Sequence, residues 1–153
     1  MPVVKQTISL PETVAASLKL RDEQLSGAVT RSVMRYVSLL AEARRDLRPQ
    51  LDAQECGLIL DACNGVAFFD AFSIRLLPEG VRDAIEMDGL DRKWGVDGPA
   101  LLAKLQATTY VQRMALVDAI GRWWNRTTEG GDLPEYGDLL TDPAPDREIG
   151  QVF

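Results

Sequence analysis

The feature that most constrains this chain is the segment Lys5–Pro11, an alternating polar and apolar run that stops at a proline. Pro11 has a fixed φ angle and no N–H group, so it suits the start of a helix and ends the extended run. Alternate residues of a strand face opposite sides. The polar side carries Lys5, Thr7 and Ser9, and the mostly apolar side carries Gln6, Ile8 and Leu10. No second strand follows, so the same strand of a second chain is the simplest partner for its backbone groups.

Two helices are predicted after this strand. The first runs from Glu12 to Leu20 and is too short to be stable alone. The second begins with Ser26 as its N-cap and runs to about Arg45. Its apolar residues recur three and four positions apart on one face: Val29, Val33, Tyr36, Val37 and Leu40. This face is the expected dimer core, and the alternative is a helical hairpin packed on its own chain.

Two stretches of the chain resemble the ribbon-helix-helix DNA-binding proteins. Lys5–Pro11 is similar to the ribbon strand of the methionine-repressor type, and Ser26–Val33 is similar to the start of that family's second helix. In that family, two copies pair their strands into a ribbon that reads the DNA major groove, and the second helix holds a DNA phosphate with backbone N–H groups. The resemblance covers about a third of the chain.

The resemblance implies three sets of functional residues. The base contacts would be Lys5, Thr7 and Ser9. The phosphate contacts would be Ser26, Gly27, Ala28 and Arg31. The dimer core would contain Ile8, Leu10, Val29, Val33, Tyr36 and Val37.

Elementary chemistry agrees with these roles. A two-stranded ribbon fits the major groove, where a lysine can donate to guanine and hydroxyls can donate or accept. A helix N-terminus offers N–H groups and partial positive charge, and Gly27 would let a phosphate approach closely. The alternatives are a solvated edge strand for Lys5, Thr7 and Ser9, and a plain N-cap for Ser26.

Charge is divided unevenly along the chain, whose formal net charge is −6. Residues 1–50 hold eight Lys and Arg against five Asp and Glu, which is +3, and residues 51–153 hold nine against eighteen, which is −9. A basic head on an acidic body suits a protein that meets phosphate at one end only. The acidic body disfavours non-specific wrapping of DNA.

A boundary is predicted near Pro49, giving a head of residues 1–49, a helical domain of 50–126 and a polar tail of 127–153. The body is expected to be an all-α bundle of about four helices, and residues 66–77 receive no assignment. A capping box at Asp52 and Glu55 is expected to open a helix that stops at 64–65, and Pro78 is expected to start a helix at 79–87. A loop or short turn at 91–98 should hold Trp94. Pro99 should start a helix at 100–106, and Thr108 or Thr109 should cap a long helix after it.

Three further features of the body can be interpreted. Cys56 and Cys63 lie seven residues apart, on the same side of a helix, and are expected to be core residues. Of Trp123 and Trp124, one is expected in the core and the other partly exposed; with Arg122 and Arg126 they could instead form a platform for a ligand or partner. The tail either lacks fixed structure in part or whole, or docks through Leu133, Tyr136, Leu139 and Leu140.

The composition argues against most enzymes. The chain has no histidine, so it lacks the commonest general base and the usual zinc ligand, and it has no glycine-rich phosphate loop. Asp61, Asp83 and Asp118 are expected on solvated faces and not in a catalytic cluster. We expect no catalytic residue, metal or cofactor. No apolar run is long enough to span a membrane and no signal peptide is evident, so a cytoplasmic protein is expected.

The sequence therefore predicts a mainly α protein with an N-terminal ribbon-helix-helix dimerisation domain. Its predicted function is that of a homodimer that binds double-stranded DNA as a transcriptional repressor or autoregulator, with a body that binds a partner or sets higher assembly. The alternative is a dimeric protein-interaction module, antitoxin-like or a plasmid-maintenance factor, whose helical body binds a partner protein.

Overall fold

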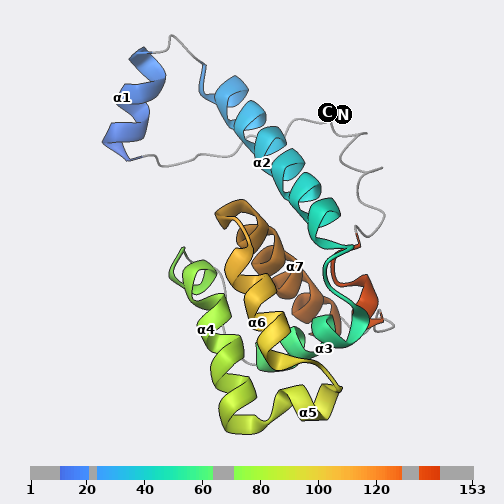
Figure 1. Ribbon diagram of the computed structural model, residues 1–153. Coiled ribbons are helices and arrows are strands. Elements are labelled where there is room, and N and C mark those ends of the chain that lie inside the picture. The colour runs from blue at the N-terminus through green and yellow to red at the C-terminus, as the bar shows by residue number, and fades with distance from the viewer. Residues whose placement is uncertain (1–10, 21–23, 64–70, 129–134, 142–153) are drawn as a thin grey trace. The chain divides into compact units, whose positions relative to one another are not determined.

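In a computed structural model of the protein, residues 11–20, 24–63, 71–128 and 135–141 are described (Figure 1). All regular structure in these residues is helical, which confirms the prediction of a mainly α chain. The elements are α1 Glu12–Leu20, α2 Leu25–Leu47, α3 Ala53–Ala62, α4 Ala71–Asp88, α5 Leu90–Trp94, α6 Gly98–Ala107, α7 Tyr110–Thr128 and the 3-10 helix η1 Tyr136–Asp138. The predicted ribbon strand lies outside the described residues.

The chain divides into two compact units, Met1–Ser38 and Leu39–Phe153, and the division falls inside α2. The last turns of α2 therefore belong to the second unit, which we call the body. The predicted functional boundaries at residues 49 and 126 stay predictions. No helix in the described part of the chain is long and apolar enough to cross a membrane.

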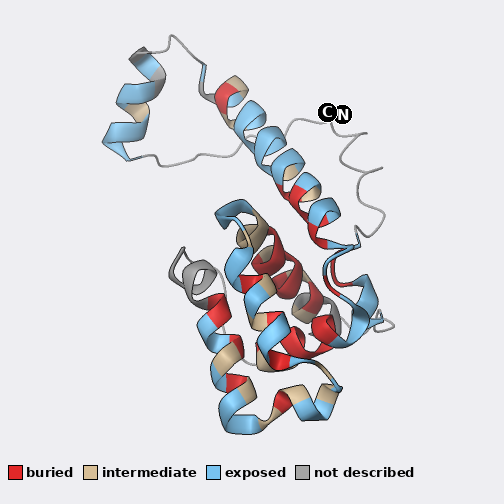
Figure 2. Ribbon diagram, in the orientation of Figure 1, coloured by how far each residue is buried: buried red, intermediate tan, exposed pale blue. Residues whose placement is uncertain are grey.

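The helices of the first unit have nearly the predicted bounds. α1 covers Glu12–Leu20 as expected, and the carbonyl of Pro11 accepts the N–H groups of Val14 and Ala15 at 3.0 and 3.1 Å. α2 begins at Leu25 and ends at Leu47, before Pro49. Most residues of α1 and of the first turns of α2 are exposed, as Figure 2 shows.

The body is built around one apolar core. α3 packs against α5 and η1, and α4 packs against α6 and α7. The side chains that are almost completely buried come from every long helix of the body: Leu47, Leu58, Ile59, Leu77, Val81, Leu101, Leu105, Leu116 and Ile120. Burying each such side chain contributes about 1.5–3 kcal/mol, so this cluster is the main source of the body's stability.

The start of α3 confirms two predictions. The Asp52 side chain accepts the Glu55 N–H at 2.8 Å, and the Glu55 carboxylate accepts the Asp52 N–H at 3.0 Å, which is the predicted capping box. Cys56 and Cys63 are both buried free thiols in the core. Burial raises the pKa of both thiols to about 12.

The prediction that Pro78 begins a helix is wrong. α4 starts at Ala71 and carries Pro78 in its interior, where the proline removes one backbone hydrogen bond. That loss costs about 3 kcal/mol in an isolated helix. Here Leu77 and Val81 on both sides of the proline are completely buried, and their burial offsets the cost.

The expected loop at 91–98 needs a correction, because Trp94 lies on the short helix α5. Gly89 and Gly95 border α5, and both have φ of 64°, a left-handed conformation that glycine adopts without strain. The two helices that follow begin as predicted. Pro99 lies in the first turn of α6, and Thr109 and Gln112 cap α7 by exchanging hydrogen bonds at 3.0 and 3.2 Å.

The part of the tail that the structure describes is docked, which confirms that alternative for residues 135–141. Leu139 and Leu140 are buried in the main core, and the Tyr136 ring packs on two tryptophans. Leu133 lies outside the described residues.

A second small cluster corrects the prediction for Leu40. Leu40 and Ala43 of α2 pack with Ala115 of α7, with Met114 beside them. Leu40 therefore belongs to the body's own packing and not to the exposed apolar face of α2.

Candidate nucleic-acid interface

The predicted base contacts cannot be placed. Lys5, Thr7 and Ser9, and with them Ile8 and Leu10 of the predicted dimer core, lie outside the described residues. Their roles stay predictions. The described part of the candidate interface is α2, which carries the predicted phosphate contacts and the rest of the predicted dimer core.

The prediction that Ser26 is the N-cap of α2 is wrong by two positions. The helix begins at Leu25, and the carbonyl of Gln24 accepts the Ala28 N–H at 3.0 Å. Ser26 and Gly27 thus lie in the first turn, where amide groups have no acceptor within the helix. The Ala28 amide is already used and its side chain is buried, so Ala28 is the least suited of the four predicted phosphate contacts.

Arg31 lies over the first turn of α2. A Cβ atom added at Gly27 would lie 3.5 Å from Arg31 Nη1, so the guanidinium folds back toward the start of the helix. Helical side chains four residues apart share a face, and they lean toward the N-terminus. The structure therefore brings Gly27 and Arg31 together at the N-terminal end of α2, where the helix carries partial positive charge.

The predicted dimer face of α2 is only partly covered within the single chain. Val33 and Tyr36 are 45% and 46% exposed, and Val29 and Val37 are partly buried. The same face continues toward the C-terminus through Leu40, Ala43 and Leu47, which are all buried. One helix face thus changes from buried to exposed along its length.

α2 also holds two exposed apolar residues that the sequence analysis did not single out. Met34 and Leu39 are 45% and 44% exposed. They lie to either side of the predicted dimer face, since neighbouring helix positions differ by about 100°. No acidic residue occurs in α2 before Glu42, so the exposed charges of its first half are Arg31 and Arg35.

The structure does not bring the three carboxylates of the body together. Asp61 accepts hydrogen bonds from Lys93 Nζ at 2.6 Å and Trp94 Nε1 at 3.0 Å. Asp118 pairs instead with Arg44 and Arg122, at 3.5 and 2.6 Å, and Asp83 is exposed. Among the described residues, no group of three or more Cys, Asp or Glu side chains is arranged to hold a metal ion.

The electrostatics of Asp61 follow from its partners. The hydrogen bond from Lys93 lowers the pKa of the Asp61 carboxyl below its usual 3.8, partial burial opposes this, and the Trp94 N–H adds to the lowering. The group is therefore a charged structural contact between α3 and α5.

The tryptophan pair of α7 is placed as predicted. Trp123 is buried in the core and Trp124 is partly buried.

The sequence analysis missed the role of Trp94, whose ring lies on α3 where Gly57 leaves room for it. A Cβ atom at Gly57 would lie 2.3 Å from that ring. A glycine inside an apolar helix was the available signal, because it weakens a helix unless close packing requires it.

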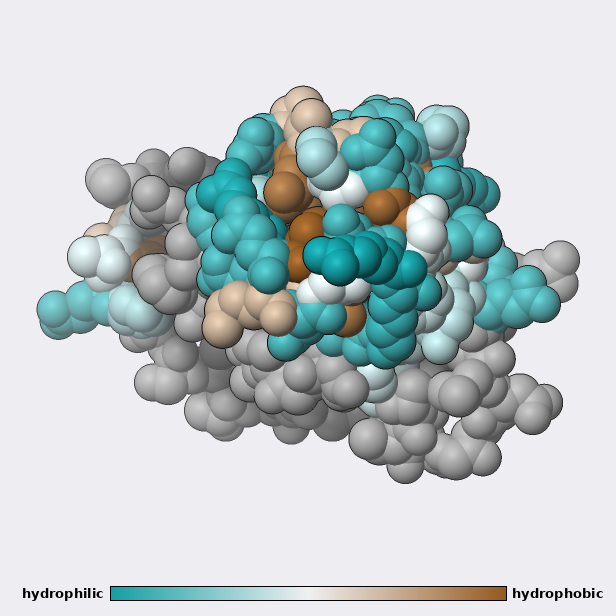
Figure 3. All heavy atoms as spheres, turned by 60° about the horizontal axis from the view of Figure 1, so that its bottom comes forward, coloured by the Kyte–Doolittle hydropathy of each residue, from teal (hydrophilic) through white to brown (hydrophobic). Residues whose placement is uncertain are grey.

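On the face shown in Figure 3, the described residues present a mostly hydrophilic surface, with smaller hydrophobic areas between polar side chains. Comparisons with protein-family models, with curated proteins and with solved structures find no match to this chain.

Proposed function

We propose that this protein is a homodimer that binds double-stranded DNA in a sequence-specific way and acts as a transcriptional repressor or autoregulator. Residues 5–10 of two copies would pair into a ribbon in the major groove, with Lys5, Thr7 and Ser9 reading bases. The resemblance of this segment to ribbon-helix-helix proteins is the origin of the proposal. The helices α1 and α2 follow the segment in the order that such a domain needs.

The observation that most supports the proposed dimer is the apolar face of α2. Its C-terminal half is covered by the body, whereas Val33 in the N-terminal half stays nearly half exposed in the single chain. α1 leaves Val33 nearly half exposed, and a helix of its length is not stable by itself. A second copy of the chain would bury this face with its own α2 and would also supply the partner strand for the ribbon.

The observation that supports a phosphate contact is the position of Arg31 beside Gly27 at the start of α2. A phosphate bound there would accept hydrogen bonds from first-turn amides and from the guanidinium. The charge division of +3 in residues 1–50 and −9 in residues 51–153 supports a DNA contact through the head and not through the body.

The test separates base reading from phosphate binding. A preferred site is first selected from random duplexes, and binding to that site and to a scrambled duplex is then titrated at several salt concentrations. Thr7→Ala should weaken binding to the preferred site by about 1–3 kcal/mol and change binding to the scrambled duplex little. Equal losses on both duplexes would show that this side of the segment does not read sequence.

Arg31→Ala should behave differently, because a phosphate contact carries no sequence information. We expect similar losses on both duplexes and a salt slope flatter by about one unit for each phosphate contact removed. Arg45→Ala is the matched control, since Arg45 is an exposed arginine near the other end of the same helix. An absence of salt-dependent DNA binding in the wild-type chain would favour the interaction module instead.

A further inference from the structure

Residues 135–141 contact the rest of the body at the joint between α2 and α3. The Leu140 carbonyl accepts a hydrogen bond from Arg48 Nη2 at 3.4 Å, directly after the end of α2. Gly137 lies against the first residue of α3, since a Cβ atom there would be 3.4 Å from the Ala53 Cβ. One short segment thus contacts both sides of the turn that joins these helices.

The same segment is held by an aromatic cluster. The Tyr136 ring meets the Trp94 ring edge to face, with centroids 4.9 Å apart and planes at 90°. It stacks on Trp123 at 5.8 Å and 25°. Both arrangements are favoured for aromatic pairs. Tyr136 is therefore attached to α5 and α7 at once.

Two leucines complete the attachment. Leu139 and Leu140 are 5% and 1% exposed, and they share the main core with Leu47 at the end of α2 and Leu51 before α3. Tyr136 by contrast is 47% exposed. The segment thus has a buried anchor and an aromatic ring that solvent reaches.

We propose that residues 135–141 form a clasp that holds the joint between α2 and α3 closed. When the clasp is docked, the last turn of α2 and the first turn of α3 are fixed to α5 and α7 through one chain segment. When it opens, the joint loses Arg48's acceptor and the apolar cover from Leu139 and Leu140. The joint and the clasp should therefore open together, as one unit of local unfolding. This inference does not depend on DNA binding.

The first test uses amide hydrogen exchange in the full chain carrying Tyr136→Ala. The Arg48 and Gln50 amides, which donate to Arg44 and Leu47 carbonyls at 3.0 and 2.9 Å, report on the joint. We expect them to exchange about tenfold faster, because two aromatic pairs are lost. The Leu101 amide, bonded to Asp97 at 3.0 Å, reports on α6 and should change much less. Unchanged exchange at the joint, or equal acceleration at Leu101, would overturn the clasp.

Two matched variants sharpen this test. Tyr136→Phe keeps the ring and should exchange like the wild type; acceleration in this variant would show that the hydroxyl holds the segment and the stacked rings do not. Tyr110→Ala removes a tyrosine that is 50% exposed at the start of α7 and should leave the joint unchanged. Acceleration of the joint in this variant would contradict a local role for Tyr136.

If Tyr136→Ala does not fold, a measurement on the wild-type chain still tests the proposal. In native-state exchange at rising denaturant, the Leu139 and Thr141 amides report on the clasp through their bonds to Tyr136 and Asp138 at 3.2 and 3.0 Å. We expect these amides and the Gln50 amide to share one opening, below the opening of α3 in free energy. Separate openings for the clasp and for Gln50 would disprove the coupling.

Discussion

The two ends of α2 have the same apolar pattern and opposite surroundings. Toward the C-terminus, Leu40, Ala43 and Leu47 are buried by the body of the same chain. Toward the N-terminus, Val33 and Tyr36 on that face remain about half exposed. The pattern alone indicates a face that needs cover, and only the fold decides whether the cover comes from the same chain.

The two units differ in how much apolar surface they bury. The body has a continuous apolar core with contributions from all its long helices. Among the residues of the first unit whose burial is described, Ala28 is the one buried apolar residue. The proposed dimer would bury further apolar surface in this unit.

The largest effect on the proposed dimer is expected from charges on the exposed half of the α2 face. Replacing both Val33 and Tyr36 with Asp should abolish the dimer, because each charge would be buried in the interface at a cost of several kcal/mol. We expect dissociation to be about a thousandfold easier or more, corresponding to about 4 kcal/mol. Sedimentation at micromolar concentration measures it, and the body should keep its helical signal.

The control for this change is Met34→Asp. Met34 is as exposed as Val33 but points about 100° away from it, so the dimer should persist. A wild-type chain that sediments as a monomer at micromolar concentration would refute both the dimer and the ribbon.

The second prediction concerns Leu140, which is buried in the main core. Leu140→Ala should lower the free energy of unfolding of the body by about 2–5 kcal/mol, because it leaves a cavity in the main core. Denaturant unfolding followed by tryptophan fluorescence measures the loss. Leu39→Ala, at a leucine 44% exposed, should cost less than about 1 kcal/mol. A cost at Leu140 as small as that expected at Leu39 would mean that the docked segment contributes little to the core.

Local signals predicted much of the fold from the sequence. The bounds of α1, the capping box at Asp52 and Glu55, and the cap at Thr109 depend on residues within one turn of each other, and all are confirmed. The burial of the two cysteines followed from spacing on one helix. In each case the information and the structure lie in the same short segment.

The parts that could not be predicted depend on distant residues. Pro78 lies inside α4 because the core covers Leu77 and Val81, and Leu40 is buried because α7 packs on it. The pairing of Arg44 with Asp118 joins positions 74 apart in the sequence. For the candidate site, the sequence indicated Gly27 and Arg31 but misplaced the start of α2 by two positions, since polar residues both before and after Leu25 suit a helix start.

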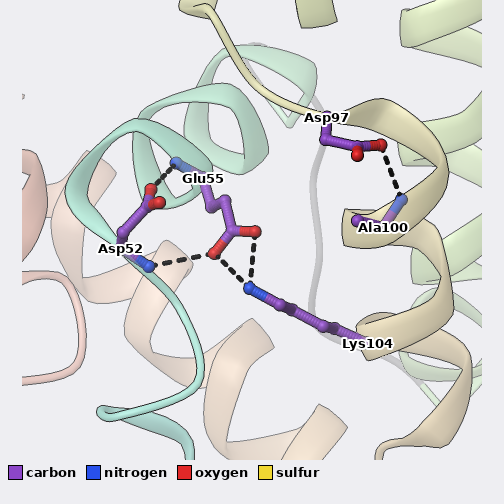
Figure 4. Close-up of polar contacts among 5 residues, drawn as sticks. All are labelled: Asp52, Glu55, Asp97, Ala100 and Lys104. Carbon is purple, nitrogen blue, oxygen red and sulfur yellow. Dashed lines mark hydrogen bonds and ion pairs between the residues drawn. The ribbon is translucent and has the colours of Figure 1, made fainter.

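The third prediction concerns how much a buried ion pair contributes to the stability of the body. The Glu55 side chain is 7% exposed, and its carboxylate accepts two hydrogen bonds from Lys104 Nζ, at 2.7 and 2.9 Å, besides the one from the Asp52 N–H (Figure 4). Lys104→Met removes the charge partner of a buried carboxylate. It should cost about 1–3 kcal/mol of unfolding free energy, measured by denaturant titration.

The matched control is Lys93→Met. Lys93 also pairs with a carboxylate, at 2.6 Å from Asp61, but its side chain is 62% exposed. An exposed pair contributes about 0.2–1 kcal/mol, so this change should cost less than Lys104→Met. The reverse order would show that burial does not set the strength of these ion pairs.

The smallest expected effect is a pH dependence from that exposed pair. The Lys93 hydrogen bond lowers the pKa of the Asp61 carboxyl in the folded chain below its usual 3.8, so folding favours the ionised form. The stabilisation is therefore complete above the unfolded pKa and disappears as the pH falls through the folded pKa. Asp61→Asn should cost under about 1 kcal/mol near pH 6, and the difference from wild type should shrink below about pH 4.

In the Lys93→Met background the same substitution should show a smaller pH dependence, because the main cause of the lowered pKa is gone. If the difference between Asp61→Asn and wild type were constant from pH 6 to pH 3, the carboxylate would not be coupled to folding.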